Sequence, residues 1–141
     1  MYLKISGKEF EKKSALAFEN SEDIKLLRNF KIELGIKVQK HHYFDFGCSI
    51  SKIIIECKNH SWTKSGNIPS AKMSIWNEAM FYFCLAPNEY RKILIVRNQK
   101  NAEKNKSLVE YYLKTYPHFI PKNVEIWEYD VENDLLNKCY S

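Results

Sequence analysis

Residues 43–58 decide the fold, and they read YFDFGCSISKIIIECK. Two segments of this stretch, 43–48 and 52–58, are rich in aromatic and β-branched residues and flank the short link Ser49-Ile50-Ser51. Residues of these types fit the pleated surface of a sheet, so each segment is predicted to be a β-strand. The short link predicts that the two strands are neighbours.

The sequence before this stretch predicts one helix and one further strand. In residues 8–19, Phe10, Ala17 and Phe18 recur at helical spacing, which predicts an amphipathic helix. In residues 30–38, apolar residues alternate strictly with polar residues or glycine, which predicts a strand with one buried face. Three successive strands then form a meander.

The sequence after this stretch alternates between helices and strands. We expect helices at residues 70–85, with Ser70 as the cap, and 107–115, and strands at residues 92–96 and 124–131. Strand, helix and strand in succession favour a parallel crossover. The prediction is a single domain, 1–141, with a three-layer mixed α/β fold: an αβββαβ core plus an additional helix and strand.

Composition excludes several classes of protein. With 141 residues, 45% hydrophobic residues, four glycines and four prolines, the chain is neither disordered nor collagen-like. It has no apolar run of the roughly 20 residues that a membrane helix needs, and no signal-peptide pattern, so we expect a cytoplasmic protein. The four cysteines form no C-x-x-C pair, and we expect them to be reduced and mostly buried.

The net charge of +5 is unevenly distributed along the chain. Residues 1–72 contain 13 basic and 8 acidic residues, whereas residues 73–141 contain 9 of each. A basic half suggests an anionic partner such as nucleic acid, although a solvated lysine-rich surface explains it equally well. The acidic residues between Glu125 and Asp134 are expected to form a solvated face away from any nucleic acid.

Asp45, Glu56 and Lys58 are the residues that carry chemistry. A hairpin can bring Asp45 beside Glu56, although two carboxylates near a core lose hydration and repel each other. A divalent cation removes both objections. Mg²⁺, or Mn²⁺ in its place, could bind Asp45, Glu56 and the backbone oxygen of Cys57, and Lys58 could bond the attacking water or a phosphate.

This arrangement resembles the PD-(D/E)xK, or restriction-endonuclease-like, nuclease superfamily. The resemblance covers roughly residues 7–96 and rests on Asp45 followed by Glu56-Cys57-Lys58 at the end of an apolar strand. It implies a metal-dependent nuclease, usually acting on DNA, in which Asp45 and Glu56 bind Mg²⁺ and Lys58 assists the attacking water. Phe44 stands where the proline of the motif would be, which puts the subfamily in doubt more than the activity.

Members of this superfamily often add a carboxylate from the first helix. Glu11 is the best match because it lies on the stripe with Ala15 and Phe18, and Glu9 is the fallback. A solvated surface glutamate is the alternative for either residue.

The loop after the proposed active strand suits contacts with nucleic acid. His60, Trp62 and Lys64, together with Lys72 and the amino end of the helix at Ser70, could contact phosphates or bases. An ordinary surface loop with Trp62 folded onto the core is an equal alternative, and a structural role is favoured for His60.

Three functional hypotheses remain open at this level. The first is an Mg²⁺-dependent nuclease, and the second is a non-catalytic nucleic-acid-binding or assembly protein with a nuclease-like fold. The third is a module that binds only protein. A domain of this size has little room for a recognition module, so a homodimer or a partner protein would have to supply specificity.

Overall fold

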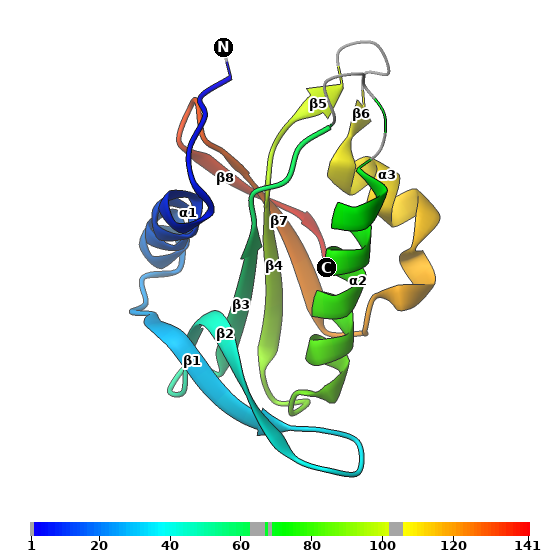
Figure 1. Ribbon diagram of the computed structural model, residues 1–141. Coiled ribbons are helices and arrows are strands. Elements are labelled where there is room, and N and C mark those ends of the chain that lie inside the picture. Colours follow the sequence, from blue (N-terminus) through cyan, green and yellow to red (C-terminus); the bar gives the residue numbers. More distant parts are fainter. Residues whose placement is uncertain (1, 63–66, 68, 102–105) are drawn as a thin grey trace.

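The computed structural model describes residues 2–62, 67, 69–101 and 106–141, and it has a mixed α/β fold (Figure 1). Within these residues a six-stranded mixed sheet is accompanied by three α-helices. The elements in chain order are α1 (Gly7–Glu22), β1 (Leu27–Leu34), β2 (Lys40–Cys48), β3 (Ile53–Lys58), α2 (Ser70–Leu85), β4 (Arg91–Arg97), β5 (Lys100–Asn101), β6 (Lys106–Ser107), α3 (Leu108–Thr115), the 3₁₀ helix η1 (Pro117–Phe119), β7 (Val124–Asp130) and β8 (Leu135–Tyr140).

The strand order in the large sheet is β1-β2-β3-β4-β7-β8. The three central strands β3, β4 and β7 are parallel, whereas β1–β2, β2–β3 and β7–β8 are antiparallel pairs. The parallel pairs require long connections across a face of the sheet, and these contain α2 and α3. The expected crossover is therefore present.

The three isoleucines of β3 pack into the core on both faces of the sheet. Ile54 packs on the side of α2 and α3, whereas Ile53 and Ile55 pack on the side of α1. Figure 1 shows α1 on one side of the sheet and α2 and α3 on the other. Because side chains alternate along a strand, Glu56 and Lys58 share the face of Ile54.

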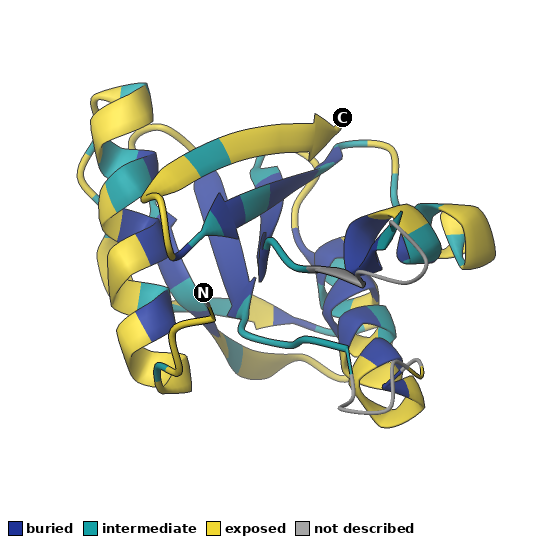
Figure 2. Ribbon diagram, turned by 90° about the horizontal axis from the view of Figure 1, so that it is seen from above, coloured by how far each residue is buried: buried dark blue, intermediate teal, exposed yellow. Residues whose placement is uncertain are grey.

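Helix α1 is well defined at both ends. The Ser6 hydroxyl accepts a hydrogen bond from the backbone N–H of Glu9 at 3.1 Å, and Asp23 ends the helix in a left-handed conformation. The apolar stripe of Phe10, Ala15 and Phe18 is buried against the sheet, while Figure 2 shows exposed residues along the outer side of the helix.

The predicted first strand is too long at its carboxyl end. Strand β1 ends at Leu34, and Ile36 and Val38 are 79% and 77% exposed in the hairpin connection. Gly35 makes this connection possible: a Cβ atom on it would lie 1.9 Å from the carbonyl oxygen of Val38, and its φ is +156°. The alternation of apolar and polar residues therefore continues beyond the end of β1 into the turn, where it no longer indicates a strand.

Three further expectations are wrong. Ser70 is the first residue of α2 but not its cap, because Pro69 occupies the cap position and makes no side-chain hydrogen bond. The strand at residues 124–131 was expected to be the last, but β8 follows it at residues 135–140. All four cysteines are free, but only Cys57 is buried.

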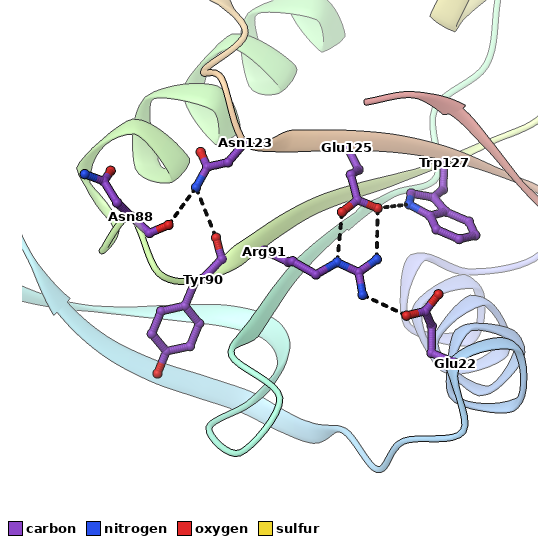
Figure 3. Close-up of polar contacts among 7 residues, drawn as sticks. All are labelled: Glu22, Asn88, Tyr90, Arg91, Asn123, Glu125 and Trp127. Atoms are coloured by element: carbon purple, nitrogen blue, oxygen red, sulfur yellow. Dashed lines mark hydrogen bonds and ion pairs between the residues drawn. The ribbon is translucent and has the colours of Figure 1, made fainter.

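The carboxylates of β7 and the following turn are not simply a solvated face. Figure 3 shows Arg91 of β4 between Glu125 of β7 and Glu22 of α1, with bonds of 2.9 and 3.0 Å to Glu125 and 2.7 Å to Glu22. Trp127 also donates to Glu125 at 3.1 Å. Burial alone would raise the pKa of Glu125, but the bonds from Arg91 and Trp127 lower it. This network fastens the end of α1 to the parallel strands.

A second arginine fastens the segment before α1. Arg97 at the end of β4 is 1% exposed and donates to the backbone oxygen of Leu3. It also donates to Glu132 at 3.0 Å and to Asn59 at 3.4 Å, and its guanidinium lies 4.0 Å from the ring centre of Tyr2. The start of the chain is thereby held against the carboxyl ends of the central strands.

Candidate functional site

The candidate site lies where β2 and β3 separate. The two strands pair from Cys48–Ile53 to Phe46–Ile55, and Asp45 and Glu56 are the next residues beyond the paired segment. The Asp45 Oδ2 atom accepts a hydrogen bond from the backbone N–H of Cys57 at 2.8 Å. The two predicted carboxylates therefore come from neighbouring positions of adjacent strands.

Strand β2 is irregular at Asp45. Phe44 packs in the core on the α2 side, whereas Phe46 packs in the core on the α1 side, although regular alternation would put both on one face. On β1, the pairs Arg28–Phe46 and Phe30–Phe44 flank Asn29, which has a positive φ of 54°. At this irregularity the Asp45 carboxylate faces β3, where it accepts the hydrogen bond from Cys57.

Glu56 is 6% exposed and lies between two basic side chains. Its Oε1 atom is 3.3 Å from Nε2 of His42, and its Oε2 atom is 3.7 Å from Nζ of Lys58. Glu56 and Lys58 thus lie together on the α2 side of β3, as their spacing predicts.

His42 is a site residue that the sequence did not reveal. Its ring stacks on Tyr82 of α2 with 3.7 Å between ring centres and lies edge-on to Phe44 at 4.6 Å. These two ring contacts hold the imidazole beside Glu56. The adjacent His41 is exposed, so the sequence pair His41-His42 gave no sign of which histidine faces the site.

Glu11 approaches the site from α1. It is partly buried and accepts a hydrogen bond from Nη2 of Arg28 at 3.0 Å. Burial raises the pKa of Glu11, and the charge of Glu56 adds to this effect, against the lowering effect of Arg28. Glu9 is exposed, so Glu11 is the better placed of the two helical candidates.

The carboxylates of the cluster repel one another. Burial raises the pKa of Asp45 to about 7, and the charges of Glu56 and Glu11 contribute to the increase. The N–H of Cys57 and the charge of Lys58 act in the opposite direction but do not cancel it. A divalent cation would relieve this repulsion, so the chemistry of the donor set fits the expected Mg²⁺.

The number of side-chain ligands is small. Within the described residues, no group of three or more His, Cys, Asp or Glu side chains could hold a metal ion. An ion bound here would depend on two carboxylates, a backbone oxygen and water, which suits Mg²⁺ because it keeps several waters. The Cys57 thiol is not available as a ligand, because it lies in the α1-side core 3.6 Å from the Ser14 hydroxyl.

A small cavity of about 50 Å³ adjoins Glu56 on the α2 side. Its lining consists of His42, Glu56, Lys58, Ile75, Glu78, Ala79 and Tyr82. The side of Glu56 facing α2 is therefore accessible to small molecules such as water.

His60 has a structural role. Its Nδ1 atom accepts a hydrogen bond from the indole N–H of Trp76 at 3.0 Å. Burial lowers the pKa of His60 to about 4, and the charges of Lys72 and Lys58 contribute. The imidazole is neutral at pH 7 and contributes no positive charge for a phosphate.

Of the other residues expected to contact nucleic acid, Lys72 lies close enough to His60 for its charge to lower the pKa of that imidazole. Trp62 is half-buried against the α2-side core, with its ring 6.4 Å from that of Tyr111, which matches the alternative of a tryptophan folded onto the core. Ser70 and Lys72 are exposed in the first turn of α2. Lys64 lies outside the described residues.

Comparisons with known proteins give no match. No family model, no curated protein and no solved structure is significantly similar to this chain. Among the described residues, no helix has both the length and the apolar character needed to cross a membrane.

Proposed function

We propose that this protein is an Mg²⁺-dependent nuclease that hydrolyses phosphodiester bonds, with DNA as the substrate. The observation that carries the proposal is the meeting of Asp45, Glu56 and Lys58 where β2 and β3 separate, with Glu11 approaching from α1. Isolated surface residues would not show this mutual electrostatic influence.

The order of elements supports the proposal. Helix α1, strands β1, β2 and β3, helix α2 and strand β4 follow one another as in the αβββαβ core of restriction-endonuclease-like enzymes, and β2 and β3 supply the motif residues. The superfamily remains a proposal, and it rests on this order and on the motif.

In the proposed reaction, a water oxygen attacks the phosphorus and one ester P–O bond breaks. The water loses a proton to solvent, and the departing oxygen takes one up. Asp45, Glu56 and the backbone oxygen of Cys57 would hold Mg²⁺, which supplies charge to offset that of the phosphate. Lys58, 3.7 Å from Glu56, would orient the attacking water or the phosphate.

Plasmid cleavage in the presence of Mg²⁺ tests the proposal. We expect Lys58→Ala and Glu56→Ala to lose about 10²- to 10³-fold in rate, the usual cost of removing one group that stabilises a transition state. Lys31→Ala, at an exposed position of β1, is the matched control and should cleave like the wild type. Equal cleavage by all variants, or none by the wild type on DNA and RNA, would contradict the proposal.

The non-catalytic alternative makes a different prediction. A nucleic-acid-binding or assembly protein would bind DNA with strong salt dependence, without turnover and without need for a metal. The raised pKa of Asp45 favours the enzyme, because a pure binding surface gains nothing from burying carboxylates beside each other.

A further inference from the structure

The outer side of α1 and the start of β1 form a basic groove. This groove has a volume of about 490 Å³. It is lined by Lys8, Glu9, Lys12, Lys13, Leu16 and Arg28. All six residues are exposed, and Figure 2 shows the outer side of α1 open to solvent.

The three lysines of the groove are available to an external anion. Within the described part of the chain, Lys8, Lys12 and Lys13 form no ion pair, whereas Arg28 is paired with Glu11. Glu9 is the one carboxylate of the lining. The groove therefore has three lysines and one arginine but a single carboxylate, that of Glu9, and its local charge is positive even though Arg28 is already paired.

The groove lies near the candidate site, because the charges of Lys8 and Arg28 from the groove and those of Glu56 and Lys58 from the site all act on the Glu11 carboxylate. Arg28 joins the two, because its guanidinium bonds Glu11 at 3.0 Å and lies 5.2 Å from the ring centre of Phe46. Phe46 directly follows Asp45 in β2. A chain of phosphates that enters the site beside Asp45 could therefore continue along α1.

We propose that this groove binds the sugar-phosphate backbone of duplex DNA next to the bond that is cleaved. This inference rests on the proposed function and specifies its substrate-binding surface. Lysines are mobile point charges that suit backbone phosphates without reading sequence. The groove offers Leu16 as its one apolar side chain, which favours a phosphate backbone over an apolar protein surface.

The proposal is tested by the affinity of metal-free protein for a fluorescein-labelled DNA duplex, measured by anisotropy at several salt concentrations. The test variant combines Lys8→Gln, Lys12→Gln and Lys13→Gln, since glutamine keeps the helix propensity of lysine. The matched control combines Lys37→Gln, Lys114→Gln and Lys122→Gln, which removes the same charge from exposed positions on other elements. Thermal unfolding verifies that both variants are folded.

We expect the groove variant to bind at least about tenfold more weakly, with a salt dependence lower by about two to three counterions, while the control stays within about twofold of wild type. Glu9→Gln should bind more tightly than wild type, because it removes the groove's anion. Equal losses in the two triple variants, wild-type affinity in the groove variant, or weaker binding by Glu9→Gln would overturn the proposal.

The outcome is separable from that of the nuclease assay, because binding is measured without metal or turnover. Loss of DNA binding in the groove variant supports the groove even if the wild type fails to cleave. Absence of wild-type DNA binding overturns the groove. Tighter, groove-dependent binding of RNA or of phosphatidylserine vesicles than of the duplex would likewise overturn the assignment to DNA.

Discussion

The Asp45 carboxylate accepts a hydrogen bond from the backbone N–H of Cys57, with 2.8 Å between Oδ2 and N. This contact joins the irregular position of β2 to the strand that carries Glu56 and Lys58. Burial disfavours the charged form of this carboxyl group despite the hydrogen bond, which has a measurable effect on stability.

The first prediction concerns Asp45→Asn and pH. The pKa of Asp45 is raised from 3.8 to about 7, so between these values the folded protein binds more protons at this group than the unfolded chain. Its contribution to the free energy of unfolding therefore falls as pH rises through that window. Asp45→Asn removes the charge and keeps an oxygen acceptor for Cys57. We expect the variant to be more stable than wild type at about pH 8 by up to about 4 kcal/mol, since a pKa difference of one is worth about 1.4 kcal/mol.

Urea unfolding of both proteins at about pH 5 and about pH 8 measures this difference. Comparing the two proteins cancels contributions from other groups, including His60, whose lowered pKa has the opposite effect on the pH dependence. A stability difference that does not grow with pH would show that Asp45 is not destabilised in its charged form.

The second prediction concerns His42. Its Nε2 atom lies 3.3 Å from Glu56, and stacking on Tyr82 fixes its ring. If Glu56 binds Mg²⁺, His42→Ala should raise the Mg²⁺ concentration for half-maximal cleavage severalfold, because the Glu56 carboxylate loses the contact with Nε2 of His42 that positions it. His42→Gln, which can still donate a hydrogen bond, should recover part of the loss.

The control for this prediction is His41→Ala, at the exposed neighbouring position of the same strand. Identical Mg²⁺ dependence of the His41 and His42 variants would remove His42 from the site. A lower rate with an unchanged Mg²⁺ requirement would also argue against a role in holding Glu56.

The third prediction concerns the bond between His60 and Trp76. His60→Ala leaves the buried indole N–H of Trp76 without its acceptor, so we expect a loss of about 1–3 kcal/mol in the free energy of unfolding. The variant should bind duplex DNA like the wild type, because the neutral imidazole offers no charge to a phosphate. His118→Ala, at an exposed position of η1, is the control for stability.

Denaturant unfolding and anisotropy distinguish the two roles of His60. Unchanged stability together with weaker DNA binding would assign His60 to the nucleic-acid surface rather than to the core.

The fourth prediction concerns Arg97. Arg97→Met keeps an unbranched apolar side chain but removes the bonds to Leu3, Asn59 and Glu132. We expect a loss of about 2–3 kcal/mol, because the hydrogen bonds from this buried, charged donor are lost. Limited proteolysis should also cleave the segment before α1 earlier than in wild type.

Glu132→Gln alone should cost less than Arg97→Met, because Glu132 is exposed and its carboxylate is solvated, whereas Arg97 is buried. An unfolding midpoint equal to that of wild type for Arg97→Met would mean that the arginine does not anchor the chain start.

An element of the fold was predictable where the local sequence pattern agrees with the burial of its residues in the folded protein. Strand β3 was predictable because an isoleucine run bounded by polar residues suits a strand buried on both faces. The end of β1 was not, because Ile36 and Val38 continue the alternation into an exposed turn. Strand β8 buries little of its surface at the edge of the sheet, and such a strand leaves little trace in the sequence.

The same distinction holds for the candidate site. Asp45, Glu56 and Lys58 were predictable, since residue type and position along two neighbouring strands define them. His42 was not, because its position depends on stacking against Tyr82 of a helix distant in sequence. The arginine networks around Arg91 and Arg97 depend likewise on contacts between remote segments, and no local spacing indicates them.

The mixed sheet implies an order of folding events. The β1–β2 hairpin closes locally, with Leu34 opposite Lys40, whereas Lys58 meets Val96 only after the chain containing α2 has crossed the sheet. Closing the longer loop costs more conformational entropy and is slower. The β2–β3 hairpin, with Cys48 opposite Ile53, also closes locally. The proposed metal-binding carboxylates Asp45 and Glu56 therefore both belong to the locally closed part of the sheet, and the cavity beside Glu56 is completed only when α2 packs on that sheet.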